Sequence, residues 1–369
     1  MTFPSPVTRS GEAGYTLIEL LVSTAIMVTV TGAIFSLMNP AQGNAQTQPE
    51  VADMQQRMRV GNDTLFREVM MAGAGPYQGN ITGSLIKYFA PIIPRRVGDI
   101  NPDPVVGAGS FTTDRLTLAY IPNTYSQTTI SQAMPPQSAE LKVTTQVNCP
   151  EDASKLCGFK EGMEVIIFDD SGNYDTFTIT QVQDDAVHVQ HRGSDLNYKY
   201  DAGASITQMV SYTYYLDRTT NQLKRYDGHT KDEAVVDNVV DLRFDYFGDP
   251  NPPTLPKPKL GVANCLYDAA GNYADLPVLS ATDGSLAELT AVQLTDGPTC
   301  GTGDNQYDAD LLRIRKIRVT MRVQAATASL RGRDTTLFRN PGTAKGGERY
   351  VPDYQLSFDI SPRNLNLTR

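Results

Sequence analysis

The sequence predicts an α+β protein in which one long N-terminal helix packs on a head of antiparallel β-strands. Residues 15–38 are membrane-compatible and carry one formal charge, a glutamate, and a run of this length favours a membrane-spanning helix. From Glu50 onward apolar residues recur every three or four positions, which is typical of an amphipathic helix. Beyond residue 76, short runs of alternating apolar and polar residues lie between turn residues, which favours antiparallel strands.

The apolar segment carries its single charge, Glu19, near its start. At about 1.5 Å per helical residue, positions 15–38 cover about 36 Å, enough to cross a hydrocarbon core of about 30 Å. The small residues that could mark a cleavage site, Gly11, Ala13 and Gly14, precede this run, so it does not have the pattern of a secretory signal peptide. A cut at these residues would leave the helix on the protein.

The position of Glu19 inside an apolar helix indicates a role in assembly. An ionised carboxylate in a bilayer costs at least about 2.5 to 3.5 kcal/mol on insertion scales, so Glu19 is expected to face a partner. Cleavage between Gly14 and Tyr15 would create a cationic α-amino group a few residues away. That amine would lie on a neighbouring turn of the same helix, and in a stack of helices it could reach Glu19 of the next copy.

The residues from Gly14 to Glu19, Gly-Tyr-Thr-Leu-Ile-Glu, followed by an apolar helix, resemble the N-terminus of type IV prepilins and pseudopilins. The resemblance implies cleavage after Gly14 by a prepilin peptidase and methylation of the new N-terminus at Tyr15. It also implies that Glu19 is the carboxylate used in docking subunits. The alternative interpretation is an ordinary signal anchor with a chance glutamate.

The resemblance divides the chain into a leader, a pilin helix and a head. The leader would be residues 1–14, and the helix residues 15–75, of which 15–38 would be transmembrane. The head would be residues 76–369, with a small β-barrel-like unit inserted at 139–209. The hairpin that leads into residues 239–244, together with residues 361–366, resembles the heads of PilW-like minor pilins and GspJ-like pseudopilins.

Within the helix, Asn39-Pro40 is predicted to kink or interrupt the chain, and residues 72–76 to stop it. The predicted packed stripe comprises Val51, Met54, Met58, Leu65, Phe66, Val69 and Met70. Residues 122–137, rich in Ser, Thr, Gln and Pro, are predicted to form an exposed loop. The predicted strands are 116–120, 163–168, 176–182, 186–190, 205–215, 222–226, 239–247, 317–323 with a bulge at Arg315-Lys316, and 354–360.

Composition argues for an exported, acidic protein. The formal net charge of −9 argues against nucleic acid or an anionic membrane as a partner of the bulk surface. Four cysteines fit an oxidising compartment, and three pairings are possible. The shortest loops favour Cys149 with Cys157 and Cys265 with Cys300. A zinc site is the alternative, but no histidine lies within these loops and no two cysteines are two to four residues apart.

Two acidic loops are candidates for calcium, the only cofactor that the sequence suggests. Asp304, Asn305, Asp308 and Asp310, together with Asp296, cluster before a strand. The loop from Asp169 to Asp175 alternates oxygen-bearing residues in the same way. Calcium binds six to eight oxygens, which such loops can supply, although neither matches the EF-hand pattern and such loops are usually turns.

No enzymatic activity is predicted. The chain has three histidines, and it has neither a Gly-x-Ser-x-Gly elbow nor a phosphate-binding loop. The basic strand could bind DNA phosphates, but pairing of its cations with carboxylates of the same chain or of a neighbouring subunit is the preferred interpretation. Its cations are Arg313, Arg315, Lys316, Arg318 and Arg322.

The predicted function is that of a minor pilin subunit in a type IV pilus, in a priming or tip complex. The partners implied are other pilins, the prepilin peptidase, the inner-membrane assembly machinery, and the membrane through residues 15–38. The head would lie in the periplasm and later on the pilus at the cell surface. Alternatives are a minor pseudopilin of type II secretion, an adhesin or DNA-capture module on a pilin stem, and a plain anchored envelope protein.

Overall fold

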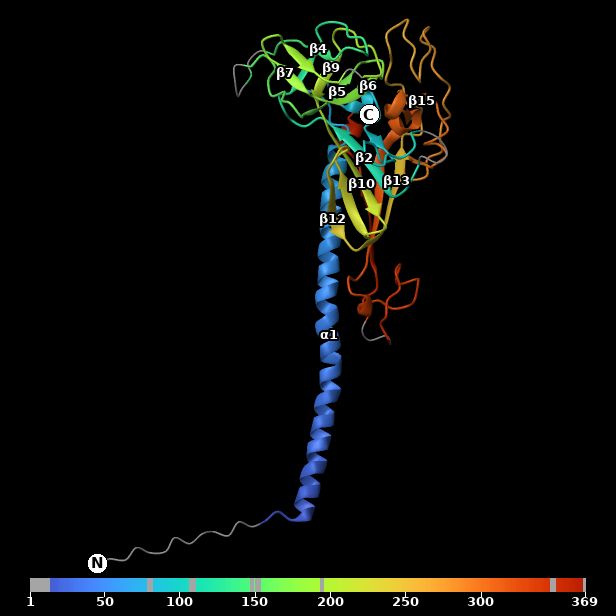
Figure 1. Ribbon diagram of the computed structural model, residues 1–369. Coiled ribbons are helices and arrows are strands. Elements are labelled where there is room, and N and C mark those ends of the chain that lie inside the picture. The colour runs from blue at the N-terminus through green and yellow to red at the C-terminus, as the bar shows by residue number, and fades with distance from the viewer. Residues whose placement is uncertain are drawn as a thin grey trace, which may run out of the picture.

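The computed structural model describes residues 14–77, 82–105, 111–146, 149, 154–192, 196–345 and 350–367, except for the side chains of 38–44. A long helix carries a β-rich head at its C-terminal end (Figure 1). This is the predicted α+β architecture, an apolar N-terminal helix followed by antiparallel sheets. Most of the predicted leader, residues 1–13, lies outside the described residues.

Helix α1 (Leu17–Met71) is continuous over 55 residues. The predicted interruption at Asn39-Pro40 is therefore wrong. A proline removes a single i→i−4 hydrogen bond, and the bonds on either side continue the helix. The predicted stop is confirmed, because the helix ends at Ala72 and Gly73 follows with φ 75°. At this end the Asn364 side chain donates to the carbonyls of Met71 and Ala72 (3.3 and 3.4 Å).

Only the second half of α1 packs on the head. Met54, Met58, Leu65 and Val69 are buried against it. Gly61 is also on this side, and a Cβ there would lie 2.5 Å from Met321 Cε, so the helix and the sheet are in close contact. The predicted stripe was too wide: Val51 precedes the buried part of the helix, and Phe66 lies about 100° further round than Leu65. These two side chains are 39% and 45% exposed.

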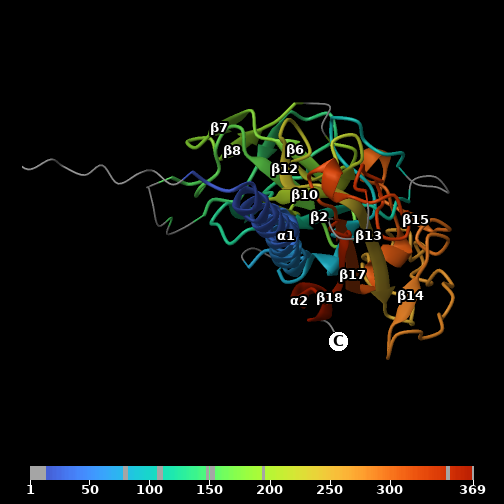
Figure 2. The same cartoon turned by 90° about the horizontal axis from the view of Figure 1, so that it is seen from below.

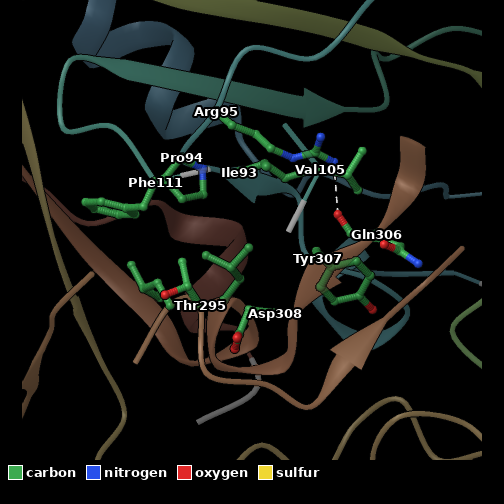
Figure 3. A pocket seen from close by; sticks show the side chains of 11 residues that line it. Ile93, Pro94, Arg95, Val105, Phe111, Thr295, Gln306, Tyr307 and Asp308 are labelled. Carbon is green, nitrogen blue, oxygen red and sulfur yellow. Dashed lines mark hydrogen bonds between the residues drawn. The ribbon is translucent and has the colours of Figure 1, made fainter. Parts of the chain in front are cut away.

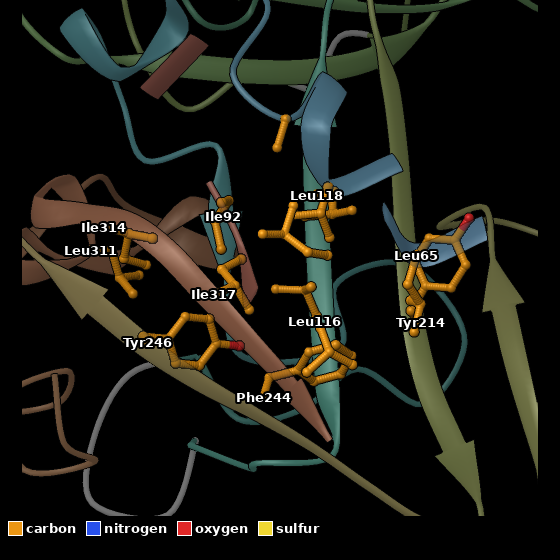
Figure 4. Close-up of a cluster of buried hydrophobic side chains, with 14 of the residues drawn as sticks. Leu65, Ile92, Leu116, Leu118, Tyr214, Phe244, Tyr246, Leu311, Ile314 and Ile317 are labelled. Carbon is orange, nitrogen blue, oxygen red and sulfur yellow. The ribbon is translucent and has the colours of Figure 1, made fainter. Parts of the chain in front are cut away.

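The main core lies between α1 and two antiparallel sheets (Figures 1 and 4). In the view from below, α1 lies at one side of the strands, with α2 (Arg363–Asn366) beside it (Figure 2). The five-stranded sheet contains β1 (Ile92–Ile93), β2 (Arg115–Tyr120), β10 (Val210–Asp217), β11 (Gln222–Tyr226) and β12 (Asp232–Asp237) in this order. The four-stranded sheet contains β14 (Ala287–Leu289), β13 (Val239–Gly248), β17 (Ile314–Val323) and β18 (Tyr354–Ile360).

Turn and bulge predictions in these sheets are confirmed. Asn221 and Asn238 adopt φ of 53° and 59° at the turns on either side of the β11–β12 pair, as suits a residue whose short amide tolerates this backbone. In the β13–β17 ladder Phe247 pairs with Lys316 and Gly248 with Ile314, so Arg315 is the bulged residue. The bulge lets both halves of β17 bury alternate side chains.

A second hydrophobic cluster lies in a smaller β unit and draws its residues from Ile130 to Ile206. Its strands form two sheets, and a barrel-like closure stays a prediction. The sheets contain β3 (Gln127–Thr129), β9 (Ser205–Gln208), β5 (Glu164–Phe168) and β6 (Tyr174–Thr178), and then β4 (Glu140–Lys142), β8 (His188–Gln190) and β7 (Gln181–Gln183).

Two strand predictions in this unit need correction. Residues 127–129 were expected in an exposed loop, but they form buried strand β3, paired with β9. The alternating run 176–182 is divided between β6 and β7, because Ile179 bonds to Met163 and Thr180 to Gln190 and so the chain passes from one sheet to the other. Similarly, 205–215 is divided between β9 and β10, which belong to different sheets.

The remaining elements are short. They are η1 (Leu85–Lys87), β15 (Thr299–Cys300), η2 (Gly303–Asn305), β16 (Tyr307–Asp308), η3 (Ala309–Arg313) and η4 (Ala328–Leu330).

Candidate functional site

The N-terminus of α1 is closed by a capping box built from the motif itself. Thr16 is the N-cap, and its hydroxyl accepts from the Glu19 amide at 3.3 Å. In return, the Glu19 carboxylate accepts from the Thr16 amide and from the Thr16 hydroxyl, both at 2.8 Å. This arrangement satisfies two helix-end donors reciprocally. It holds the carboxylate of Glu19 against Thr16, which is the second residue after the Gly14–Tyr15 bond.

The helix that follows is apolar and lies outside the head. Leu17–Leu37 has a mean hydropathy of 2.1 and no part of it is buried. It is therefore long and apolar enough to cross a membrane. Its hydroxyls bond to carbonyls of the preceding turn: Thr24 reaches Leu20 at 2.9 Å and Thr29 reaches Ala25 at 2.7 Å. Glu19 thus remains the one charged side chain of the span.

One comparison identifies this N-terminal arrangement. The sequence model of the prokaryotic N-terminal methylation motif matches residues 9–35, which include Gly14, Tyr15 and Glu19. No curated protein and no solved structure matches the chain. The motif and the helix together define the class, a type IV pilin-like protein with a prepilin-type N-terminus, which supports processing by a prepilin peptidase. In particular, Gly14 and Tyr15 stand at the predicted cleavage point.

The structure divides the main calcium candidate between two places. The Asp304 carbonyl accepts from Arg95 at 2.7 Å (Figure 3 shows Arg95 and the neighbouring Gln306), and the Asn305 amide donates to Asp175 at 3.1 Å. Asp308 and Asp310 instead lie with Asp296, and their carboxylate oxygens are within 4.8 Å of one another. The four residues that the sequence suggested as calcium ligands therefore do not form one site.

The acidic group that does form has structural partners. Asp308 caps η3 by accepting from the Asp310 amide at 2.8 Å, and it also accepts from the Gly297 amide at 2.7 Å. Burial raises the pKa of Asp308 to about 6. Asp310 pairs with Arg313 at 2.6 Å. These contacts with groups of the same chain explain why both carboxylates are buried, and they require no metal ion.

The second acidic loop is also explained by local bonding. Asp169 accepts from the amides of Ser171 and Asn173 at 2.8 and 3.2 Å, which is the ordinary bonding of a turn. Asp175 is fully buried and joins distant segments. It accepts from the Asn197 amide (2.9 Å), the Tyr198 amide (3.2 Å), the Tyr200 hydroxyl (2.9 Å) and the Asn305 side chain (3.1 Å).

The cysteines form the two bonds that the shortest loops favour, Cys149 with Cys157 and Cys265 with Cys300. Cys157 and Cys300 are buried. On the chain-entropy model, the second bond closes a loop of 35 residues and stabilises the fold by about 4 kcal/mol.

Most cations of the basic strand pair with carboxylates of the same chain. Lys316 and Arg318 both contact Asp359, at 3.0 and 2.7 Å, and both also contact Asp283. Arg322 contacts Asp353 at 3.0 Å. Arg315 donates to the backbone carbonyls of Leu312 and Ile314. Most of the positive charge of this strand is therefore paired within the head, which is the interpretation preferred from the sequence.

Two hollows of the described head are small. The first, lined by Ile93, Phe111 and Leu311 among others, has a volume of about 20 Å³, which is room for one water molecule (Figure 3). The second, between Phe111, Arg243 and Glu288, has about 180 Å³. Small-molecule sites usually have about 300 Å³ or more. The candidate functional site is the N-terminal helix, because it carries the matched motif and the apolar span.

His229 joins the main sheet region to the smaller β unit and yields a testable pH dependence. Its Nε2 lies 3.0 Å from Glu164 of β5, and its Nδ1 lies 2.9 Å from Asp99. Hydrogen bonds to Glu164 and then to Asp99 raise the pKa of His229 to about 9. Since the folded pKa lies above the ordinary value of about 6.5, this stabilisation is complete below pH about 6.5 and is lost as the pH rises through 9.

We therefore expect H229Q to flatten the decline in thermal stability of the full-length protein between pH 7 and 9.5. The measurement is the unfolding midpoint by circular dichroism in detergent. H188Q is the matched control, because His188 lies in the smaller β unit that His229 contacts and its ring nitrogen is 3.7 Å from a carboxylate oxygen of Glu140. Equal pH dependence in H229Q and the wild type would contradict the assignment.

Proposed function

We propose that the protein is a minor pilin, a PilW-like subunit that takes part in type IV pilus assembly in a priming or tip complex. The observation that carries the proposal is a bare apolar helix, Leu17–Leu37, that begins within the Gly14–Glu19 motif. A soluble protein would bury such a surface against its own core. A subunit that moves from a membrane into a helical filament needs this surface free of its own head, so that lipid covers it first and neighbouring subunits cover it afterwards.

Assembly would proceed through the two charges at the helix start. Cleavage after Gly14 frees the Tyr15 amine, which the peptidase methylates. Glu19, which Thr16 holds at the helix end, then meets the amine of a neighbouring copy. Both charges are otherwise costly in an apolar core, so their pairing favours the docked state over the isolated one.

The size of the head supports a minor over a major subunit. The head adds a second β unit, with its own hydrophobic cluster, to the two sheets that pack on α1. Such a volume would crowd a tightly packed shaft and is accommodated more easily at an end of the filament. Before assembly the span would lie in the inner membrane with the head in the periplasm, and the partners would be other pilins and the assembly machinery. We assign the head no enzymatic role.

The mature N-terminus tests this function. Mass spectrometry of the protein from sheared filaments is expected to find a chain that starts at N-methylated Tyr15 and lacks residues 1–14. G14V is expected to keep the leader and to leave the filament fraction. Deletion of the gene is expected to reduce piliation with type II secretion intact. A leader retained on the wild-type protein would refute processing, whereas lost secretion with normal pili would identify a pseudopilin.

A further inference from the structure

The described part of the connection between β17 and β18, residues 324–345 and 350–353, forms a loop on the membrane side of the head. It leaves the head beside α1 and extends along the helix toward the apolar span, apart from the rest of the β structure (Figure 1). Two contacts attach its base to the helix. The Ala326 amide donates to Glu50 at 2.7 Å, and Arg57 donates to the Gln324 carbonyl at 3.3 Å. We name this segment the membrane-side loop.

The membrane-side loop is anchored by buried side chains, so its surface residues are presented in a defined way. Leu330 and Val351 belong to the main core cluster, and Phe338 is also buried. The Val351 amide donates to Leu330 at 2.7 Å, and the rings of Phe338 and Tyr350 meet edge to face with centroids 5.5 Å apart. These contacts join the two ends of the loop to each other.

Among the described residues, three exposed cations on the outer surface of this loop outnumber one exposed carboxylate, Asp334, although the chain as a whole is acidic. Arg333, Arg339 and Lys345 are exposed, and among the described residues none of their side chains lies in an ion pair. This contrasts with the cations of β17, which contact carboxylates. Between Arg333 and Arg339 lies Leu337, a large apolar side chain that is 38% exposed. Cations around an exposed apolar residue are typical of a surface that meets lipid headgroups.

The position of the loop along α1 places this surface near the membrane. Thirteen residues separate Glu50, where the base is attached, from Leu37, where the apolar span ends, or about 20 Å of helix. Headgroups occupy about 5 to 8 Å of that distance. The loop extends into the remainder, and the Debye length of about 8 Å allows its cations to interact with anionic lipids across a thin water layer.

We propose that the membrane-side loop docks on the anionic lipid surface next to the span. Its cations Arg333, Arg339 and Lys345 bind headgroup phosphates, and Leu337 enters the headgroup layer. The contact holds the head close to the membrane before the helix is extracted. The proposal needs only that Leu37 marks the membrane boundary, so it does not depend on the subunit's place in a filament.

The absence of tryptophan from the chain allows a direct test. The L337W variant of the full-length protein, in nanodiscs that contain phosphatidylglycerol, is expected to show a blue-shifted emission. Dibrominated lipids should quench it at least about twofold. L260W is the matched control, since Leu260 is 87% exposed in the loop between β13 and β14. Its emission should stay that of a residue in water.

Charge dependence distinguishes the proposal from simple apolar contact. Adding R333Q, R339Q and K345Q to L337W is expected to abolish the shift and the quenching, as is the use of phosphatidylcholine alone. Adding K142Q, K160Q and K199Q, all exposed cations of the smaller β unit, should leave both unchanged. A probe that responds equally in the two lipids, or in neither, would overturn the proposal. Circular dichroism checks that each variant is folded.

Discussion

R313L is expected to lower the free energy of unfolding by about 3 to 5 kcal/mol. Arg313 is fully buried and makes three contacts. Its Nε donates to Asp310 at 2.6 Å, and its Nη atoms donate to the carbonyls of Pro250 and Pro277, each at 2.9 Å. The substitution leaves a buried carboxylate without its cation and two carbonyls without donors, and it detaches the loop after β13 from the sheet.

Urea unfolding of the full-length protein in detergent, followed by near-ultraviolet circular dichroism, measures this loss. R218L is the control, because Arg218 contacts Asp114 at 3.0 Å but is 53% exposed, and such pairs contribute about 0 to 1 kcal/mol. The double variant R313L/D310L should recover part of the stability, since it removes both charges. A loss no larger than that of R218L would show that the buried pair does not hold this loop.

E19A is expected to insert normally into the membrane but to enter filaments at least about 30-fold less than the wild type. Insertion becomes easier because a carboxylate leaves the apolar span. Docking becomes weaker because the neighbour's Tyr15 amine loses its counter-charge, and loss of one member of a buried charge pair costs about 2 to 5 kcal/mol. The capping partner of the Thr16 amide is lost as well.

Quantitative immunoblotting of membrane and sheared-filament fractions from the same cells measures this effect. D63A is the matched control, because Asp63 is a carboxylate of the same helix that lies outside the span and is 56% exposed. Mass spectrometry should find E19A cleaved after Gly14, which separates a docking defect from a processing defect. Filaments with a normal content of E19A would count against the proposed pairing of Glu19 with the amine.

The sequence alone was enough to predict those features whose interacting groups are neighbours along the chain. The Gly14–Glu19 motif, the membrane-spanning length and the helix stop at Ala72–Gly73 all depend on residues a few positions apart. The same holds for the hairpin turn at Asn221 and the bulge at Arg315, which appears as a slip in an alternating pattern. Local sterics and periodicity determine such features.

Contacts between segments that are distant in the sequence could not be predicted from local patterns. Asn305, a predicted calcium ligand, instead donates its side-chain amide to Asp175, which is 130 residues away. Residues 127–129 form a strand because β9 lies beside them. Likewise, the sequence of the basic segment 333–345 is that of an ordinary loop, and only the fold shows that it lies beside α1 on the membrane side. The sequence by itself thus predicted a membrane-spanning helix and a cleavage point after Gly14. The tertiary structure decided which charges are paired and which stay free, because that depends on the segments that long-range packing brings together.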